Sequence, residues 1–490
     1  MKLGDLLRDV PVVSVRADRD ANVHSVTADS RQVTTGSVFV AVQGFVVDGA
    51  RFVDQAFEQG AACVVSEKPR QRDGGGWIEV QDARVALALL AANLHGRPAE
   101  SLALIGVTGT SGKTTTTKMV ESILDATGEP VGLIGTIEYR AGESREIADR
   151  TTPDPVVLQS WFARMVGAGV KRAVMEVSSH ALALRRTHGV PFAAAVFTNL
   201  SRDHFDFHRD FDDYFAAKKM LFDQIDRSRR TAVVNVDDPY GRTLAAELGS
   251  AAMTFGRAGD ADIRPAANFE VSIRGLRGKM ITPAGEIEID SPLLGWPNLS
   301  NWMGAIGAAI VTGVDTESIQ KGIRNLQSVR GRFERVEVAD GGTVVVDYAH
   351  KPDALEKLLR AVRDLAPERK IVVLFGCGGD RDAGKRPLMG EIAAKLADTT
   401  IITSDNPRGE DALVIIRQIE DGYRSTGRQD CLIVPDRRQA IERAVEMVSR
   451  DCVVVVAGKG HETYQVVGDQ IIHFDDREEV ELAGKKAVQK

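Results

Sequence analysis

The sequence predicts an α/β protein with three domains: a small N-terminal α/β domain, a central P-loop domain on a parallel sheet, and a C-terminal Rossmann-like, doubly wound domain. Three observations predict this fold class. The chain has 490 residues, enough for about three domains. Apolar runs of strand length alternate with amphipathic helical stretches, which is typical of sheets covered by helices. The loop VTGTSGKTTTT (107–117) joins one such run to a helix.

The N-terminal domain is predicted to span residues 1–98, where the apolar and amphipathic stretches are short. The predicted strands are 37–44 and 62–67, and the predicted helices are 50–61 and 85–96. The stretch GRPAES (96–101) has the glycine and proline of a linker, so we expect the domain to end there.

The central domain is predicted to span residues 99–332. Its first strand, 102–108, leads through the loop into a helix at 114–128, which Gly128 ends. One face of that helix carries the apolar residues Met119, Val120, Ile123 and Leu124. Further strands are predicted at 172–178, 193–200 and 231–238. Because these runs are almost entirely apolar, we expect a mostly parallel sheet that is buried on both faces.

The C-terminal domain is predicted to span residues 333–490, where strands and helices alternate regularly. The predicted strands are 343–348, 370–376, 399–405, 431–436 and 452–458, and the predicted helices are 352–366, 386–397, 411–424 and 437–449. A doubly wound sheet binds ligands beyond the carboxyl ends of its strands. The glycine-rich stretch at 375–385 has Arg381 in place of the third glycine, so it does not predict a nicotinamide dinucleotide site.

Composition excludes several classes of protein. The net charge is 62 − 69 = −7, which argues against nucleic acid as the main partner. The N-terminus lacks the apolar core of a signal peptide, and no apolar run approaches the ~20 residues that cross a bilayer. The four cysteines show no C-x-x-C spacing and fit reduced thiols. We therefore expect a cytoplasmic protein without a membrane partner, and no obligate protein partner is evident.

The loop at 107–117 predicts a site for nucleoside triphosphate. Gly109 and Gly112 allow backbone N–H groups to turn inward, and the start of the helix favours an anion. Lys113 is placed to reach the β and γ phosphates, and Thr114 or Thr115 to bind magnesium. The alternative, a glycine turn before a threonine-rich helix, fits the strand–loop–helix context less well.

Many motifs in order resemble the Mur ligase family across nearly the whole chain. They are TGTSGKTTTT (108–117), TTPDP (151–155), MEVSSHAL (175–182), FTNLSRDHFDFH (197–208), YFAAKKMLF (214–222), VVNVDDP (233–239), GRFERV (331–336), DYAHKPDAL (347–355), GCGGDRDAGKRPLM (376–389), SDNPRGE (404–410) and VAGKGHETYQ (456–465). The resemblance is to the branch that adds the third residue of the peptidoglycan stem. It implies a P-loop ATPase-like central domain and an acyl-phosphate intermediate made from ATP and a carboxylate.

The resemblance also assigns residues to ATP, Mg²⁺ and catalysis. The implied ATP residues are Gly109, Thr110, Ser111, Gly112, Lys113, Thr114, Thr115, Asn298, Arg332 and Asp347. The implied metal ligands are Thr114, Thr115, Glu176, His204 and Lys218, the last as a carbamate formed with CO₂, and the implied catalytic residues are Lys113, Glu176, His204 and Lys218. Asp203, Asp206 and His208 stay unassigned. An unmodified, phosphate-binding or solvated Lys218 is the alternative to the carbamate. Ser111 stands where most relatives have Asn.

The first domain is implied to bind the UDP-MurNAc-L-Ala-D-Glu substrate together with the central domain. The implied contacts are Ser30, Thr151, Thr152, Ser178 and Arg186. Leu184 replaces a polar Gln of some relatives, and the loop Phe45–Val47 is more apolar than the family's uracil-side loop. The resemblance therefore does not assign a substrate hydrogen bond to Leu184, nor uracil contacts to Phe45–Val47.

The motif SDNPRGE predicts which amino acid is added. Pro407 makes a rigid turn after a strand, so Arg408 presents a planar fork suited to a carboxylate. meso-Diaminopimelate has a distal carboxylate that needs such an arginine, whereas lysine has none. The implied diaminopimelate residues are Arg381, Asp405, Asn406, Pro407, Arg408, Gly458 and Glu462.

Two other functions are weighed against a diaminopimelate-adding ligase. One is a sister ligase that adds lysine or glutamate, including folylpolyglutamate synthase; the first domain and the D-N-P-R motif argue against it. The other is a P-loop switch, in which Arg381, Arg408 and Glu462 would have no role.

Overall fold

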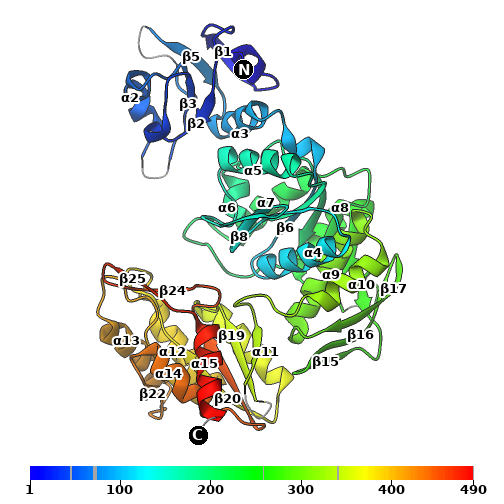
Figure 1. Cartoon of the computed structure of the whole chain (residues 1–490), viewed down its shortest axis with the longest axis vertical. Helices are drawn as coiled ribbons and strands as arrows, with labels where there is room; N and C mark the ends of the chain where they lie inside the picture. The colour runs from blue at the N-terminus through cyan, green and yellow to red at the C-terminus, as the bar shows by residue number, and fades with distance from the viewer. Residues whose placement is uncertain (45–46, 70–73, 258, 339–341, 489–490) are drawn as a thin grey trace. The chain divides into compact units, whose positions relative to one another are not determined.

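The computed structural model describes residues 1–44, 47–69, 74–257, 259–338 and 342–488. Their contacts divide the chain into two compact units (Figure 1). The first unit comprises Met1–Arg264, Thr282–Gly285 and Asn301–Gly322, and the second comprises Pro265–Ile281, Glu286–Ser300 and Ile323–Lys490. The first unit contains two α/β sheets and the second a third, which confirms the predicted class. The exact domain boundaries stay predictions.

The N-terminal sheet has the strand order β1-β5-β4-β3-β2. Its neighbours pair in parallel except β1, which runs antiparallel to β5. Apolar residues of its two faces fall into separate buried clusters, with Val38, Val40 and Val65 in one and Phe39 and Val64 in the other. Its elements are α1 (Leu3–Leu6), β1 (Val12–Arg16), β2 (Ser25–Thr27), β3 (Ser37–Ala41), α2 (Val53–Glu58), β4 (Cys63–Ser66), β5 (Gly76–Val80) and α3 (Ala83–Leu94).

The central sheet has the strand order β13-β12-β11-β6-β10-β7-β8-β9. From β13 to β7 all neighbours are parallel, and β8 and β9 add an antiparallel edge. The carboxyl ends of β11, β6, β10 and β7 therefore meet at one edge. The strands are β6 (Ala103–Thr108), β7 (Val131–Ile134), β8 (Glu138–Ala141), β9 (Ser144–Ile147), β10 (Arg172–Glu176), β11 (Phe192–Phe197), β12 (Ala232–Asn235) and β13 (Ala252–Phe255).

Helices follow most strands of this sheet. They are α4 (Lys113–Ala126), α5 (Pro155–Gly167), α6 (Ser179–Ala183), α7 (Phe211–Lys219) and α8 (Pro239–Leu248), and α9 (Gly295–Val311) and α10 (Thr316–Asn325) come later in the chain. The face predicted for 114–128 is confirmed, because Met119, Val120 and Ile123 are fully buried. Short 3₁₀ helices are η1 (Ser30–Gln32), η2 (Gly49–Phe52), η3 (Pro98–Ser101), η4 (Met220–Asp223) and η5 (Gly249–Ala251).

A small sheet that the sequence did not predict lies between the central and C-terminal elements along the chain. Its order is β14-β16-β15, and β17 also pairs with β16. Its strands are β14 (Arg264–Pro265), β15 (Glu270–Ser272), β16 (Gly275–Thr282) and β17 (Gly285–Ser291). Alternating exposed charged and buried apolar residues in β17 show that one face is open to solvent.

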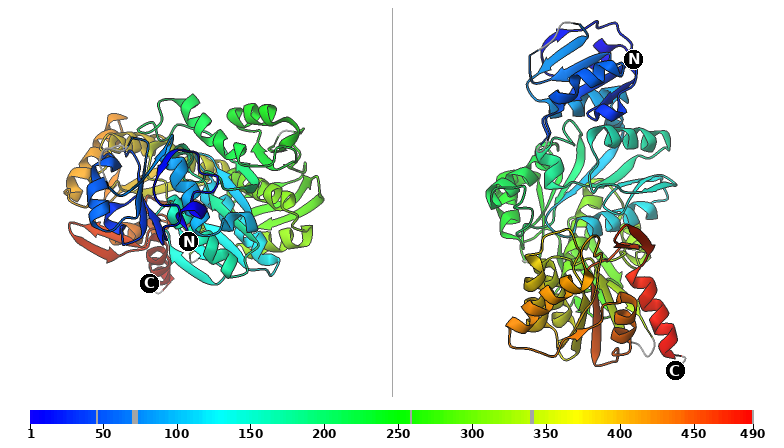
Figure 2. Two further views of the ribbon diagram at one scale, coloured as in Figure 1. Left: turned by 90° about the horizontal axis from the view of Figure 1, so that it is seen from above. Right: turned by 90° about the vertical axis from the view of Figure 1, so that its left-hand side faces the viewer.

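The C-terminal sheet has the order β18-β19-β23-β20-β21-β22 and is doubly wound (Figure 2). Val345, Val373 and Val455 pack with α11 to α13 in one buried cluster, whereas their neighbours along the strands pack with α14 and α15 in another. The strands are β18 (Glu334–Glu337), β19 (Thr343–Asp347), β20 (Lys370–Phe375), β21 (Thr399–Ile402), β22 (Leu432–Ile433) and β23 (Cys452–Ala457). The helices are α11 (Pro352–Leu365), α12 (Lys385–Leu396), α13 (Ala412–Ser425), α14 (Arg437–Val445) and α15 (Asp476–Val488).

Three details of this region differ from the sequence prediction. The edge strand β18 was not predicted. The strand expected at 431–436 is only two residues long, because β22 is an edge strand with one neighbour. A hairpin that was not predicted, β24 (Tyr464–Val467) and β25 (Gln470–His473), follows β23.

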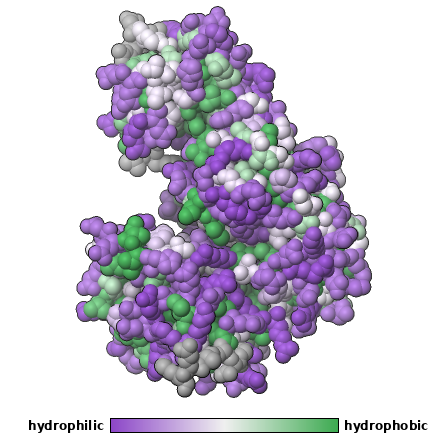
Figure 3. Space-filling model, in the orientation of Figure 1, coloured by the Kyte–Doolittle hydropathy of each residue, from purple (hydrophilic) through white to green (hydrophobic). Residues whose placement is uncertain are grey.

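The surface of the molecule is mainly hydrophilic on the face drawn in Figure 3. Apolar side chains gather over the β24–β25 hairpin, where Val467, Ile471 and Ile472 are exposed. Among the described helices, none has the length and apolar character needed to cross a bilayer.

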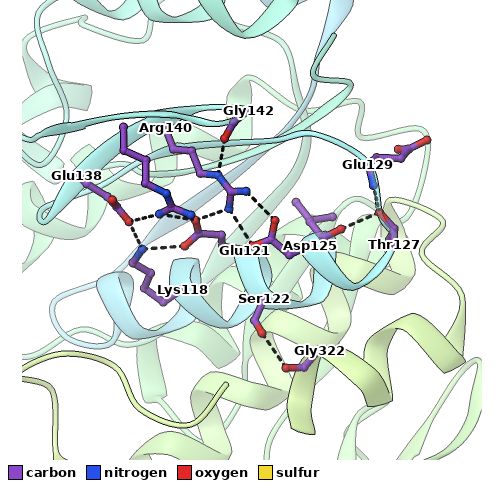
Figure 4. A network of polar contacts seen from close by, with 12 residues as sticks. Lys118, Glu121, Ser122, Asp125, Thr127, Glu129, Glu138, Arg140, Gly142 and Gly322 are labelled. Carbon is purple, nitrogen blue, oxygen red and sulfur yellow. Dashed lines mark hydrogen bonds and ion pairs between the residues drawn. The ribbon is translucent and has the colours of Figure 1, made fainter. Parts of the chain in front are cut away.

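A buried ionic network fixes α4 against the antiparallel edge of the central sheet (Figure 4). Arg140 on β8 donates to Glu121 and to both carboxylate oxygens of Asp125, each at 2.8 Å. Lys118 donates to Glu121 at 2.8 Å and to Glu138 at 2.5 Å. Burial opposes ionisation of Glu121, but Lys118 and Arg140 hold its pKa below the ordinary value. The network therefore orients the helix that begins at the loop 109–112.

Replacing Arg140 by Met is expected to lower the free energy of unfolding by about 3 kcal/mol, because it removes one of the two cations that hydrogen-bond the buried Glu121 carboxylate. Urea unfolding followed by circular dichroism measures the change. The matched control is Arg145→Met, whose half-exposed side chain also pairs with Glu138 and should cost less than about 1 kcal/mol. Equal losses in the two variants would contradict this account.

Candidate functional site

The phosphate loop is shaped by two glycines and held by the end of β11. Gly109 has φ 151°, and a Cβ there would lie 1.9 Å from Thr198 Oγ1. Gly112 has φ 87° and precedes α4. Thr198 Oγ1 donates to Ser111 O at 2.7 Å, and Ser111 N donates to Asn199 Oδ1 at 3.0 Å. Ser111 thus needs no amide side chain to be fixed, because Thr198 and Asn199 hold its backbone.

Lys113 and Thr110 lie on the inner side of this loop. Lys113 Nζ donates to Gly109 O at 2.8 Å and to Thr110 O at 3.0 Å. Thr110 Oγ1 is 3.2 Å from the hydroxyl of Tyr214 on α7. The loop, the lysine and α7 are therefore brought together as a cradle with a cation and inward-turned backbone, which suits phosphate.

The carboxylate of Glu176 lies at the centre of the strand ends. Glu176 is 1% exposed at the end of β10, and Thr114 Oγ1 donates to its Oε2 at 3.0 Å. Thr136, after β7, contacts the same carboxylate. Thr115 is also buried, but Thr114 is the threonine whose hydroxyl reaches Glu176. A hydroxyl beside a carboxylate is the oxygen donor set that Mg²⁺ prefers when phosphates complete the shell, so these residues fit the metal.

Lys218 lies beside this cradle on α7 and is 1% exposed. Its Nζ lies 4.3 Å from the centre of the Tyr214 ring. Burial, then the charge of Lys113, hold the pKa of Lys218 well below its ordinary value, against the opposing effect of Asp203. A neutral amine is the form that adds CO₂, so the environment fits a carbamate.

The cluster around His204 does not form a metal site by itself. Its other members are Asp203, Asp206 and His208, which the sequence left unassigned. In the described part of the chain, no three His, Cys, Asp or Glu side chains are arranged to hold a metal ion. His204 has φ 56°, and its Nε2 lies 3.4 Å from Asp203 Oδ2. His208 is buried between Ser179 Oγ at 3.0 Å and Asp213 Oδ2 at 3.3 Å. His208 therefore ties α6 to α7 instead of facing a metal, and Asp206 shifts the pKa of His180 and His208 only as a nearby charge.

Four of the five predicted substrate residues gather around the start of α6. Thr152 is 1% exposed and donates to Glu176 O at 2.8 Å, and Ser178 N donates to Thr152 Oγ1 at 3.1 Å. Arg186 donates to Thr152 O at 2.7 Å, and burial lowers its pKa. Thr151 lies next in the chain and is partly exposed. The hydroxyl and carbonyl of Thr152 therefore bind other residues of the protein, whereas Thr151 and Arg186 remain partly exposed to solvent.

The remaining predicted substrate positions lie apart from this group in the chain. Ser30 begins η1 and is 7% exposed. Leu184 follows α6 as its C-cap residue. Phe45 and residue 46 lie outside the described residues, and Val47 is exposed. The prediction for the uracil-side loop is thus left as it stood.

The second unit contains the three remaining residues predicted for ATP. Asp347 ends β19, and its carboxylate accepts from Phe333 N at 2.6 Å and Ala349 N at 2.8 Å. Burial raises its pKa, while Arg332 opposes that rise. The Nε of Arg332 is buried without a hydrogen-bond partner, and its guanidinium lies 4.9 Å from the Tyr348 ring centre. Asn298, on α9, is buried and donates to Leu294 O at 2.9 Å.

Two arginines converge on the loop after β20. A Cβ at Gly378 would lie 2.9 Å from Arg408 Nη1 and 4.0 Å from Arg381 Cγ. Arg408 has φ 52°, its N–H donates to Val466 O, and its Nη1 donates to Gly379 O at 2.8 Å. Arg381 is exposed. Two cations at the carboxyl end of adjacent strands can hold a carboxylate.

The neighbouring residues form a second, buried polar group. Asn406 Nδ2 donates to Glu462 Oε2 at 2.9 Å, and Lys459 Nζ donates to Asn406 Oδ1 at 3.0 Å. Lys459 is fully buried and also lies 3.4 Å from Glu462 Oε2 and 3.7 Å from Asp405 Oδ1. Gly458 has φ 117°, and a Cβ there would lie 2.9 Å from Asp405 Oδ2. The partly exposed Glu462 and buried Asp405 can therefore attract an ammonium group.

Sequence reasoning missed several residues that shape this second-unit site. Lys459 orients Asn406 and Glu462, but a lysine between two glycines gives no signal of burial. The charges of Glu462, Arg408, Asp405 and Arg381 all act on the hydroxyl of Tyr464, whose pKa is raised mainly by burial, so Tyr464 lies among them.

The buried Arg386 is the second group missed. It pairs with both oxygens of Glu410 at 2.8 Å and donates to Gly378 O at 3.2 Å. Glu410 in turn accepts from Asp380 N at 2.6 Å. Arg386 therefore joins the loop after β20 to the loop that carries Arg408. Its pairing with an acid 24 residues away could not be read from the sequence.

Three family models match the chain. They are "Mur ligase family, catalytic domain" over residues 22–95, "Mur ligase middle domain" over 107–309, and "Mur ligase, glutamate ligase domain" over 331–460. The three matches leave residues 1–21, 96–106, 310–330 and 461–490 unmatched.

Similar proteins share nearly the full length. The chain is 42% identical to a UDP-N-acetylmuramoyl-L-alanyl-D-glutamate--2,6-diaminopimelate ligase of Geobacter metallireducens, over 99% of this chain and 98% of the relative. It is 44% identical to the protein of that name from Solibacter usitatus, over 97% of each. A solved structure of a ligase of that name matches with a TM-score of 0.74 and 30% identity, and covers 100% of both chains.

The partly buried His461 predicts a loss of stability in acid. Burial, with the charges of Arg332 and Arg330, lowers its pKa to about 4, and its Nδ1 has no hydrogen-bond partner. The unfolded chain therefore binds a proton that the folded chain does not between pH ~6.5 and ~4, and stability falls as pH falls through this window. In His461→Gln this fall should be smaller by about 3 kcal/mol in urea unfolding at successive pH values. The exposed His24→Gln is the control; an unchanged acid limb in His461→Gln would refute the assignment.

Proposed function

The chain belongs to the Mur ligase family, and from that premise we propose that it joins meso-2,6-diaminopimelate to UDP-MurNAc-L-Ala-D-Glu with ATP, in peptidoglycan precursor synthesis. The observation that carries the proposal is that the Arg408 guanidinium and the stem of Arg381 border Gly378, and that the charges of both arginines act on Tyr464 in the second unit. A P-loop switch has no use for such a site, and a lysine-adding or glutamate-adding ligase has no distal amino-acid head to place there.

ATP is proposed to bind at the loop 109–112 with Lys113 on its phosphates. Glycine geometry at Gly109 and Gly112 and the two oxygen contacts of Lys113 support this. In the second unit, Asp347 is proposed to bind ribose and Arg332 phosphate, with Asn298 as a further nucleotide contact. The unpartnered Nε of Arg332 supports its part.

Mg²⁺ is proposed to bind at Thr114 and Glu176, with His204 as a ligand of a second ion. When bound, the metal neutralises the crowded anions of phosphate and carboxylate. The protein residues hold the reactants: Thr114 and Glu176 fix the metal side, and Lys113 offsets the charge that develops on the transferred phosphate. Thr151, Ser178 and Arg186 are proposed to hold the dipeptide, with Ser30 on the nucleotide-sugar side.

The reaction then balances in two steps. An oxygen of the glutamyl carboxylate attacks the γ-phosphorus of ATP. The bond between that phosphorus and the β-phosphate oxygen breaks, which releases ADP and forms an acyl phosphate. The amine of diaminopimelate attacks the acyl carbon, loses a proton, and phosphate leaves. Each step brings anions or a charged intermediate together, so cations near the phosphates lower the barrier.

Lys218 is proposed to carry a carbamate. The group would supply an anion that binds metal or orients phosphate. Its full burial and lowered pKa support the proposal because a protonated lysine does not react with CO₂. A cytoplasmic location is also proposed, and the free state of all four cysteines agrees with it.

Diaminopimelate is proposed to bind with its distal carboxylate on Arg408 and Arg381 and its ammonium on Glu462 and Asp405. Asn406 and Pro407 shape the turn, and Gly458 allows close approach. The buried Lys459 fixes Asn406 and Glu462, so the acceptor oxygens are held before the amino acid arrives.

Phosphate release from ATP tests the function when each substrate is omitted in turn. Release should require UDP-MurNAc-L-Ala-D-Glu and diaminopimelate together. Release that needs neither would indicate a P-loop switch. Equal release with lysine or glutamate in place of diaminopimelate would indicate a sister ligase.

Arg408→Ala is expected to raise the KM for diaminopimelate about ten- to hundred-fold, because charge-assisted hydrogen bonds to a carboxylate are lost. The KM for ATP should stay within about two-fold, since the change affects no charged bond to phosphate. Arg408→Lys keeps the charge without the planar fork and should be intermediate. The exposed Arg443→Ala is the control; equal changes in both KM values would reject the role of Arg408.

Lys218→Ala is expected to lower kcat by about a hundred-fold or more, because a charge that orients phosphate is lost. Short carboxylates such as acetate should restore part of the rate by occupying the vacated space. Lys219→Ala, which removes a partly exposed pair with Glu247 and a contact with the Phe215 ring, is the control. The wild-type protein should take up isotope-labelled bicarbonate at this residue in mass spectrometry; absence of label and of rescue would rule out the carbamate.

A further inference from the structure

Thr136 makes two contacts with the carboxylate of Glu176, although no assignment above gives it a role. Its backbone N–H donates to Oε1 at 2.7 Å, and its hydroxyl donates to Oε2 at 3.1 Å. Thr136 lies two residues after β7, the parallel neighbour of β10, which Glu176 ends. The preceding residue is Gly135, where a Cβ would lie only 3.0 Å from Glu176 Oε1. The loop therefore approaches the carboxylate as closely as the backbone allows.

The same hydroxyl also lies 3.0 Å from Thr151 Oγ1. A carboxylate only accepts hydrogen bonds, and a hydroxyl has one proton. With Glu176 ionised, the proton of Thr136 is directed to Glu176, and Thr151 must donate to Thr136. The hydrogen bonds thus run in one direction, from Thr151 through Thr136 to Glu176.

This series of hydrogen bonds joins a residue proposed to bind metal to a residue proposed to bind the dipeptide. Glu176 is the proposed metal carboxylate, and Thr151 is a proposed contact of the dipeptide. Thr114 donates to Glu176 Oε2 from the phosphate-loop helix, whereas Thr136 is bonded to both carboxylate oxygens. Two bonds from one residue fix the plane of the carboxylate, since rotation about its axis would break at least one of them.

Resting on the proposed function, we propose that Thr136 is a positioning residue that fixes the Glu176 carboxylate for its metal and, through the same hydroxyl, fixes Thr151 for the dipeptide. Its hydroxyl is the shared element, so its removal affects both ligands. Its backbone N–H holds the loop and is unaffected by side-chain changes.

The first experiment measures binding of UDP-MurNAc-L-Ala-D-Glu by isothermal titration calorimetry. Thr136→Val keeps the shape and the backbone bond but removes the hydroxyl, and it should weaken binding about three- to ten-fold, as for one lost hydrogen bond. Thr136→Ser restores the hydroxyl and should bind within about two-fold of the wild type, since no hydrogen bond is then lost. Thr243→Val, which removes an exposed hydroxyl on α8, is the matched control.

The second experiment measures Mn²⁺ as a probe of the metal site, by electron paramagnetic resonance with a non-hydrolysable ATP analogue present. Thr136→Val should weaken Mn²⁺ binding about three- to ten-fold, and Thr136→Ser should not. Glu176→Gln distinguishes the proposed metal role of Glu176 from the proposed positioning role of Thr136. If Glu176→Gln itself leaves Mn²⁺ binding unchanged, the proposed metal role of Glu176 fails; if only Thr136→Val leaves it unchanged, the inference about Thr136 fails.

A double-mutant cycle tests the link to the substrate side. If Thr136 acts on the dipeptide through Thr151, Thr136→Val should weaken dipeptide binding in the wild type but hardly in a Thr151→Val background. Fully additive losses, or a Thr136→Ser variant as weak as Thr136→Val, would overturn the proposal.

Discussion

The arrangement of the loop 109–112 and the neighbouring strand ends depends on the hydrogen bonds to the Glu176 carboxylate. A carboxylate that is 1% exposed is stable only if hydrogen bonds replace its lost water. Those bonds come from Thr114, at the start of α4, and Thr136, after β7. Because β6, β10 and β7 are parallel neighbours, their carboxyl ends bring these residues together. The hydrogen bonds to this buried carboxylate thus fix the start of α4, the loop after β7 and the end of β10 relative to one another.

The second unit contains a buried cation, the ammonium of Lys459, which is also satisfied by polar partners. Lys459 is fully buried after β23, and Asn406, Asp405 and Glu462 surround its ammonium. The same bonds that satisfy Lys459 hold Glu462 in place, while Arg386 fixes the loop that carries Arg408 through Glu410. Buried, paired charges make the amino-acid site rigid before ligand binding, which reduces the cost of ordering it on binding.

Much of this could be predicted from the sequence because the signals are local. The apolar runs predicted β6, β10, β11 and β12 of the central sheet and most C-terminal strands to within a few residues, but not β7, β8, β9, β13 or β18. The strand–loop–helix context predicted the phosphate loop. The small sheet β14–β17 and the β24–β25 hairpin were missed, since their short strands mix charged and apolar residues without a clear period. Assignments by motif named Glu176 and Arg408 but not Thr136, Lys459 or Arg386. Each of those three has a partner 24 to 53 residues away, and only the folded chain brings such pairs together.

The most direct measurement is the mass of the nucleotide product from a reaction that offers diaminopimelate, lysine and glutamate at equal concentration. The reaction contains ATP and UDP-MurNAc-L-Ala-D-Glu. If Arg408 and Arg381 bind the distal carboxylate and Glu462 and Asp405 bind the ammonium beside it, the product should carry diaminopimelate alone, because lysine lacks that carboxylate and glutamate lacks that ammonium. A product that carries lysine or glutamate in comparable amount would contradict the account.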